Sequence, residues 1–134
     1  MALRRILFLA IVSGLLAVPL MCKEDGHEWA KTDTLLSGAY VACEFVDWMQ
    51  TREICRHPEL DESNPALGPH PTAGQINRHF IKTTLIDLAL AYVLKKVAPP
   101  WVSRTFQSVN IGVELDCINA NRKNGIRVNL GFTF

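Results

Sequence analysis

Four prolines, Pro58, Pro65, Pro69 and Pro71, crowd the stretch between residues 56 and 74. Proline fixes its own φ and lacks a backbone N–H, so it ends or kinks helices and interrupts strands. The stretch also shows no helical or strand period, and it is therefore predicted to be a loop. This loop divides the chain into a segment before it and a segment after it.

The segment before the loop predicts an amphipathic helix over about residues 34–55, with Thr32 or Asp33 as its N-cap. Polar residues recur along it at spacings of three or four, which places them on one face of a helix. This polar stripe consists of Tyr40, Glu44, Asp47 and Thr51. Apolar residues such as Leu36, Cys43 and Val46 occupy the neighbouring faces.

The segment after the loop predicts a second helix, from residue 72 or 73 to residue 98, because a pair of prolines follows it. Its apolar part, residues 80–97, spans about 27 Å as a helix, which is just enough to cross a bilayer. Lys82 and Asp87 interrupt this part, so it predicts only a marginal transmembrane helix.

The last third of the chain changes period. Apolar and polar residues alternate over residues 109–117 and again over 126–134, with an Asn124-Gly125 turn signal between the two runs. This pattern predicts a β-hairpin, although the first run also fits a helix continuing from Arg104. The expected fold class is therefore mainly α with a C-terminal β-hairpin (α+β), in which two helices follow a cleaved leader.

The leader, residues 1–22, has the layout of a secretory signal: a basic pair precedes an apolar run from Ile6 to Leu20. The run is shorter than the roughly 20 residues that cross a bilayer, so we expect export and cleavage. Residues 23–134 would then form a single small domain. The cut is placed only between residues 17 and 30, because Leu20 fits signal peptidase poorly. Lipidation at Cys22 is a disfavoured alternative, since Met21 precedes it.

The charge and the length of the chain exclude several classes of function. The 134 residues carry a net charge of +1 with no basic cluster, which argues against a nucleic-acid partner. The length excludes most cofactor-binding enzyme folds, and no cofactor is expected.

Cys43 and Cys55 would lie about 18 Å apart along one helix, beyond disulfide reach. Only Cys117 can pair with one of them; otherwise all three are small buried side chains.

Carboxylates on the two predicted helices form the first candidate site. The candidate binding residues are Glu44, Asp47 and Thr51 on the first helix and Asp87 on the second. Two facing helices can bring such groups together for metal binding or acid–base chemistry. The alternative is structural, with Asp47 accepting a hydrogen bond from Trp48 or pairing with an arginine.

Residues in and beside the loop form the second candidate site. His57, His70 and His79 flank acidic residues and are the candidate metal ligands. They lack the spacing of known zinc motifs, so turn residues are the alternative interpretation. Asn64 is expected to cap backbone groups in a rigid turn, and such an ordered turn is a candidate binding surface.

Three arrangements at a membrane remain open. If both helices span, the basic residues that follow the second helix lie outside, against the positive-inside rule. If only the second helix spans, these residues lie inside, in agreement with the rule. In the third arrangement both helices stay in the periplasm and cover the hairpin.

Several motifs resemble those of a group of short bacterial and prophage-encoded envelope proteins without an established activity. The resemblance covers most of the chain after the leader, and it implies export and a shared fold but no catalytic role. The motifs include Asp47-Trp48-Met49-Gln50-Thr51-Arg52, Glu62-Ser63-Asn64-Pro65-Ala66-Leu67-Gly68 and Ile76-Asn77-Arg78-His79-Phe80.

The sequence as a whole favours an exported, non-catalytic cell-envelope protein at the inner membrane or in the periplasm of a bacterial cell. Its partners would be the membrane or envelope proteins, and no small-molecule ligand is defined. The alternative is a small metal-binding or metal-dependent periplasmic protein that uses Asp47, Asp87 and the loop histidines.

Overall fold

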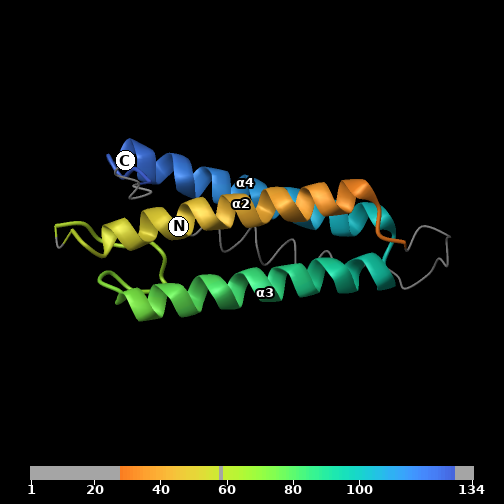
Figure 1. The fold of residues 1–134 in the computed structure, drawn as a ribbon, viewed down its shortest axis with the longest axis horizontal. Helices are drawn as coiled ribbons and strands as arrows, with labels where there is room; N and C mark the ends of the chain where they lie inside the picture. Colours follow the sequence, from red (N-terminus) through yellow and green to blue (C-terminus); the bar gives the residue numbers. More distant parts are fainter. Residues whose placement is uncertain (1–27, 58, 129–134) are drawn as a thin grey trace, which may run out of the picture.

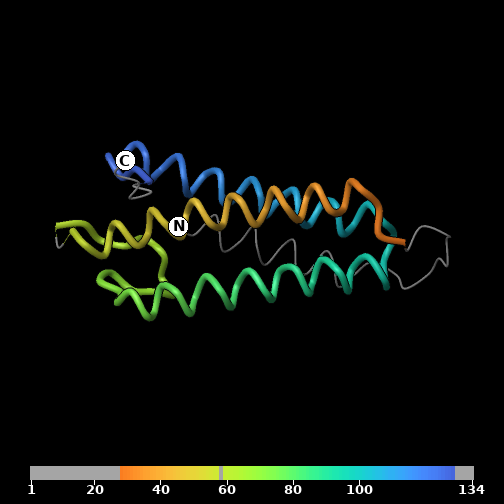
Figure 2. Tube along the Cα trace, in the orientation of Figure 1, coloured from red at the N-terminus to blue at the C-terminus, as the bar shows by residue number. Residues whose placement is uncertain are grey.

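A computed structural model describes residues 28–57 and 59–128 of the chain. Three long helices make up this part: α2 (Lys31–Ile54), α3 (Ala73–Val97) and α4 (Pro100–Lys123). They lie side by side, with α2 and α4 running in one direction and α3 in the other (Figure 1). A long loop joins α2 to α3 at one end, and a tight turn joins α3 to α4 at the other (Figure 2). The described residues therefore form a three-helix bundle.

The starts of α2 and α3 are fixed by local hydrogen bonds. Ala30, not Thr32 or Asp33, is the N-cap of α2, and its N–H donates to Asp33 Oδ2 at 2.9 Å. α3 begins with a capping box, in which Gln75 N–H donates to Thr72 Oγ1 and Thr72 N–H donates to Gln75 Oε1. Both helices lie close to their predicted bounds, because caps and prolines act locally.

The predicted C-terminal β-hairpin is wrong for the described residues. Residues 109–117, expected as its first strand, lie inside α4, and residues 126–128 form no strand. Residues 129–134, the rest of the second predicted strand, lie outside the described residues. Among residues 28–57 and 59–128 the fold class is therefore helical, without the α+β component.

The Asn124-Gly125 signal ends a helix instead of turning a hairpin. Gly125 has a φ of +82°, a backbone conformation that glycine adopts without strain. Its N–H donates to Arg122 O at 3.1 Å, and the N–H of Ile126 donates to Asn121 O at 3.0 Å. This pair of bonds is the Schellman motif that closes helix C-termini. Asn-Gly is common both in hairpin turns and at helix C-termini, because each of these structures needs a residue with positive φ.

The interior of the bundle mixes apolar and polar side chains. The buried apolar residues include Tyr40, Ile54, Ile76, Phe80, Ala91, Val102 and Phe106. The buried polar residues are nearly as many: Asp33, Glu44, Asp47, Gln50, Thr51, Lys95, Ser103 and Gln107. Apolar periodicity is therefore a poor guide to which residues of this chain face inward.

The transmembrane interpretation of residues 80–97 is wrong. In the part of the chain that the structure describes, no helix combines the length and the apolar character needed to cross a bilayer. Charged residues break the apolar stretch of α3, namely Lys82, Asp87, Lys95 and Lys96. The predicted leader, residues 1–22, lies outside the described residues.

Candidate functional site

Tyr40 of α2 connects the inward faces of α2 and α3. Its hydroxyl donates to Asp87 Oδ2 at 2.7 Å and lies 3.2 Å from Glu44 Oε1. The Thr83 hydroxyl of α3 lies 3.0 Å from the same Glu44 oxygen. Glu44 and Asp87, both predicted site residues, are thus brought together around the buried side chain of Tyr40. The groups beside them here are the uncharged hydroxyls of Tyr40 and Thr83.

Glu114 of α4 adds a further carboxyl group. Burial, reinforced by the negative charges of Glu44 and Asp47 and by a hydrogen bond to Glu44, raises the pKa of Glu114 to about 9. Glu114 is therefore protonated at neutral pH and donates to Glu44. We call Glu44, Asp47, Asp87 and Glu114 the carboxylate cluster. Its members come from all three helices.

The pKa values of Asp87 and of its hydrogen-bond donor Tyr40 are raised as well. Burial raises the pKa of Asp87, although the hydrogen bond from Tyr40 partly opposes this effect. Burial also raises the pKa of Tyr40 far above its ordinary value, and the bond to Asp87 and the charge of Glu44 add to the shift. Both groups therefore favour the protonated form more strongly than they would in water.

Asp47 accepts a hydrogen bond from an amide of α4. Asn121 Nδ2 of α4 donates to Asp47 Oδ1 at 2.9 Å and to Gln50 Oε1 at 3.3 Å. Trp48 donates to Asn77 at 3.0 Å, not to Asp47. Thr51 is buried one turn further along the same face of α2. The predicted polar stripe of α2 is thus its buried face.

A separate ion cluster ties the three helices at their other end. Asp33 of α2 lies 3.0 Å from Lys95 Nζ of α3 and 2.9 Å from Arg104 Nε of α4. Burial alone would raise the pKa of Asp33, but hydrogen bonds from Arg104, the Ala30 N–H and Lys95 bring it to about 2. The charge of Asp33 is therefore compensated by two cations.

The three predicted metal-ligating histidines make separate contacts. His57 uses opposite ring nitrogens to reach Glu53 and Glu59, at 3.6 Å and 3.1 Å, so these two carboxylates cannot share one metal with it. His70 lies 3.4 Å from Asp61. Within residues 28–57 and 59–128, no three His, Cys, Asp or Glu side chains are arranged to hold a metal ion.

The predicted role of Asn64 in its turn is confirmed. Its Oδ1 accepts a hydrogen bond from the backbone N–H of Ala66 at 3.0 Å, and its own N–H donates to Glu62 Oε1 at 2.7 Å. The predicted disulfide alternative is not realised, since Cys43, Cys55 and Cys117 form no disulfide.

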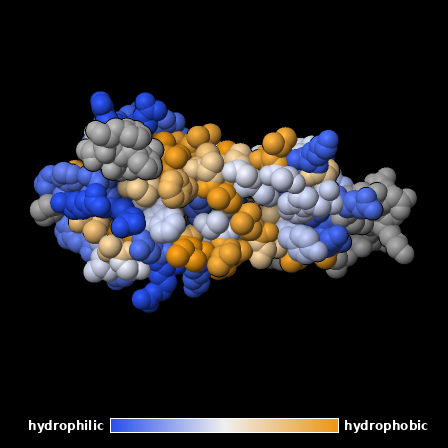
Figure 3. Space-filling view, viewed as in Figure 1, coloured by the Kyte–Doolittle hydropathy of each residue, from blue (hydrophilic) through white to orange (hydrophobic). Residues whose placement is uncertain are grey.

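The outward face of α3 is apolar, and we call it the apolar face. Its large side chains are 39% to 63% exposed: Ile81, Leu85, Ile86, Leu90, Tyr92, Val93 and Val97. Hydrophobic residues also gather over the middle of the visible side of the bundle, between more hydrophilic ends (Figure 3). The bundle thus buries many of its polar groups and exposes many of its apolar ones.

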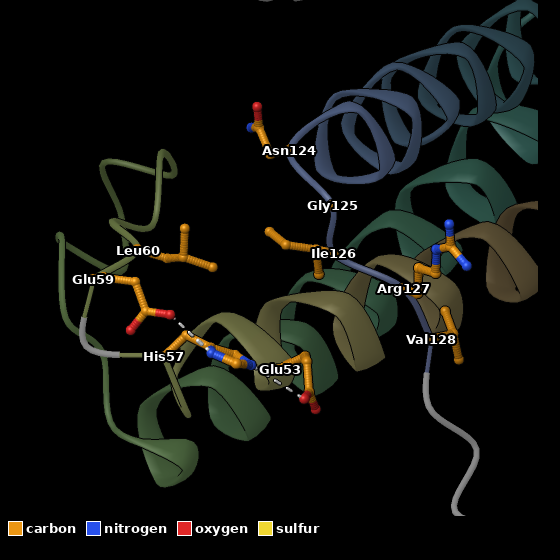
Figure 4. Close-up of a pocket in the computed structure, with 9 residues that line it drawn as sticks. All are labelled: Glu53, His57, Glu59, Leu60, Asn124, Gly125, Ile126, Arg127 and Val128. Carbon is orange, nitrogen blue, oxygen red and sulfur yellow. Dashed lines mark hydrogen bonds and ion pairs between the residues drawn. The ribbon is translucent and has the colours of Figure 1, made fainter.

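Two cavities lie at the loop end of the bundle. The larger, about 590 Å³, lies between the end of α2 and the residues that follow α4, with His57 between Glu53 and Glu59 on one wall and Arg127 on the opposite side (Figure 4). The smaller, about 170 Å³, lies beside the first turns of α3. Neither is lined by the carboxylate cluster.

The sequence pattern missed Glu114 and Asn121 because both were assigned to the hairpin region. A usable signal is the helical spacing of Asn110, Glu114, Cys117 and Asn121, which places these residues on one face of α4. Reading polar spacing as well as apolar spacing would have identified that face.

The fold and the site define a class of protein: a small helical bundle with a carboxylate-rich interior and an apolar outer face. The chain matches no protein-family model, no curated protein and no solved structure at a significant level.

Proposed function

We propose that the protein is an exported, non-catalytic envelope protein that binds the surface of an anionic bilayer through the apolar face of α3. The observation that carries this proposal is the run of large, exposed apolar side chains along that helix. Full burial of one such side chain contributes about 1.5–3 kcal/mol. Several half-exposed ones together are enough for reversible binding.

The charges and aromatic residues beside the apolar face favour lipid as its partner. Lys82 and Lys96 are exposed near its two ends, and each cation near an anionic surface contributes about 1 kcal/mol. Tyr92, with Lys96 Nζ 5.6 Å above its ring, and Trp29, 6.1 Å from Tyr92, lie towards one end. Such aromatic rings favour the membrane–water interface. A helix of this kind lies on a membrane surface.

The carboxylate cluster supports a structural role in this protein. Hydrogen bonds join Glu114 to Glu44, Asp87 to Tyr40 and Asp47 to Asn121, so the cluster connects the three helices. Neither of the two cavities is lined by its members. Neither cavity therefore offers a substrate a route to Glu44 or Asp87. This arrangement favours a binding protein over an enzyme.

Vesicle co-sedimentation tests the proposal. The purified protein is mixed with phosphatidylcholine vesicles, with or without phosphatidylglycerol, and the bound fraction is measured. We expect binding to the anionic vesicles, and at least a tenfold loss for the double variant Leu85→Gln/Val93→Gln, since about 1.4 kcal/mol corresponds to tenfold. Both side chains are exposed, so the fold is retained.

The matched control is Val113→Gln/Leu115→Gln, which removes two exposed apolar side chains from α4. This control is expected to bind as the wild type does. Absence of wild-type binding to either vesicle, or an equal loss in both double variants, would contradict the proposal. Export is checked separately by the mass of the chain recovered from fractionated cells.

A further inference from the structure

The smaller cavity has a basic lining. Its volume is about 170 Å³, and it lies between the proline-rich loop and the first turns of α3. No acidic side chain lines it. The lining residues are Ala66, Leu67, Gln75, Arg78, His79 and Lys82. We call this cavity the basic pocket.

The basic pocket lies in line with the apolar face. Along α3, Gln75, His79, Lys82, Ile86 and Ala89 follow one another at spacings of four and three residues, so they share one stripe of the helix surface. The stripe passes from pocket residues to exposed apolar residues within one turn. A flat surface that covers the apolar face therefore also meets the mouth of the pocket.

The positive charge of the pocket comes from Arg78 and Lys82. Arg78 and Lys82 are exposed, stand one helical turn apart, and form no ion pair within residues 28–57 and 59–128. An arginine fork and a lysine ammonium together suit the oxygens of a phosphate group. The uncompensated charge thus favours an anion in the pocket.

His79, another polar residue of the lining, is hydrogen-bonded to the loop. Asn64 Oδ1 accepts from the N–H of Ala66, so its Nδ2 faces the ring and donates to His79 Nε2 at 3.1 Å. The ordered turn holds one wall of the pocket in place before any ligand arrives.

We propose that the basic pocket binds the phosphate group of an anionic lipid headgroup while the apolar face of α3 lies on the bilayer. This inference rests on the proposed function and adds the chemistry of the partner. Arg78 and Lys82 contact the phosphate oxygens. The apolar stripe beyond Lys82 lies against the acyl chains of the same leaflet.

The test compares two charge-matched double variants on vesicles that contain phosphatidylglycerol. Arg78→Gln/Lys82→Gln removes the pocket cations, and Arg122→Gln/Lys123→Gln removes two exposed cations from the end of α4. We expect at least a tenfold weaker binding for the pocket variant and less than a twofold change for the control. Circular dichroism verifies that both variants keep their helical content.

A second arm distinguishes a lipid headgroup from free phosphate. Glycerol 3-phosphate is titrated into the protein while the amide NMR signals of Gln75, Arg78 and Lys82 are followed. We expect shifts confined to the pocket at concentrations at least a hundredfold above the lipid concentration for vesicle binding. Equally tight binding of glycerol 3-phosphate would overturn the assignment to a lipid.

The outcomes separate this inference from the proposed function. Vesicle binding that is unchanged in the pocket variant but lost in Leu85→Gln/Val93→Gln overturns the pocket and leaves the apolar face standing. An equal loss in the two charge-matched variants overturns the pocket as well, since general surface charge then explains binding. No vesicle binding by the wild type overturns both proposals.

Discussion

Asp33 and Lys95 are almost completely buried, with exposed fractions of 0% and 1%. Removing two charges from water is costly, and good geometry with additional hydrogen bonds has to offset that cost. Asp33 meets this condition, because it also accepts from Arg104 and from the Ala30 N–H. One carboxylate therefore joins α2 to both other helices and caps its own helix as well.

Substitution of Lys95→Met is expected to destabilise the bundle by about 3–5 kcal/mol, since it leaves the buried carboxylate of Asp33 with less compensation. Urea denaturation monitored by circular dichroism measures the change in the free energy of unfolding. The control is Lys96→Met at the exposed neighbouring position, with an expected loss below about 1 kcal/mol. Equal losses of unfolding free energy in both variants would show that the buried Asp33–Lys95 pair stabilises the bundle no more than an exposed lysine does.

α4 shows how an element is misread when its buried face is polar. Asn110, Glu114 and Asn121 lie on the side of α4 that meets the carboxylate cluster, so the alternating apolar residues between them do not mark a core. The Pro99-Pro100 pair and Gly125, in contrast, act through backbone geometry. These residues correctly place the ends of α4 once a helix is assumed.

The contrast between backbone signals and buried side chains also explains what the sequence predicts in α2 and α3. The end of α2 and the bounds of α3 follow from the prolines beside them, and the stripe of Glu44, Asp47 and Thr51 follows from helical spacing. Residues from a third helix could not be added to that stripe, because tertiary contacts alone bring Glu114 beside Glu44. Hydropathy predicts a membrane span over the apolar part of α3, because it does not distinguish an exposed face from a buried one.

Two glycine substitutions test the helical assignment of α4. Gly112 lies within the helix with open space around its Cα, so Gly112→Ala is expected to stabilise the protein by about 0.5–1 kcal/mol. Gly125→Ala is expected to destabilise it by about 1–2 kcal/mol, since alanine resists positive φ. Thermal unfolding measures both. Destabilisation by Gly112→Ala would contradict a helix at that position.

At the scale of the whole molecule, the two buried ionic clusters respond to pH in opposite ways. The pKa of Glu114 is raised from 4.5 to about 9, so the stability it contributes is complete below pH 4.5 and is lost as pH rises towards 9. The pKa of Asp33 is lowered from 3.8 to about 2, so its contribution is present above pH 3.8 and is lost as pH falls towards 2.

The melting temperature is therefore expected to be highest near about pH 4 to 5 and to fall on both sides. Glu114→Gln, which still donates to Glu44 but cannot ionise, should flatten the alkaline side. At pH 8 it should melt at least roughly 4 °C above the wild type, which corresponds to about 1 kcal/mol. Asp116→Asn, an exposed position on the same helix, is the control. A wild-type profile that rises from pH 5 to pH 9 would contradict this prediction.

The polar interior also bears on how this chain tolerates variation. An apolar core accepts many residues of suitable volume. Tyr40, Glu44 and Asn121, in contrast, each make a hydrogen bond that depends on a particular functional group. For the membrane binding proposed above, the side chains of the apolar face need only be apolar, whatever their shape. Under random mutation, the polar part of the interior would therefore be selective for chemical identity, and the apolar face for hydrophobicity alone.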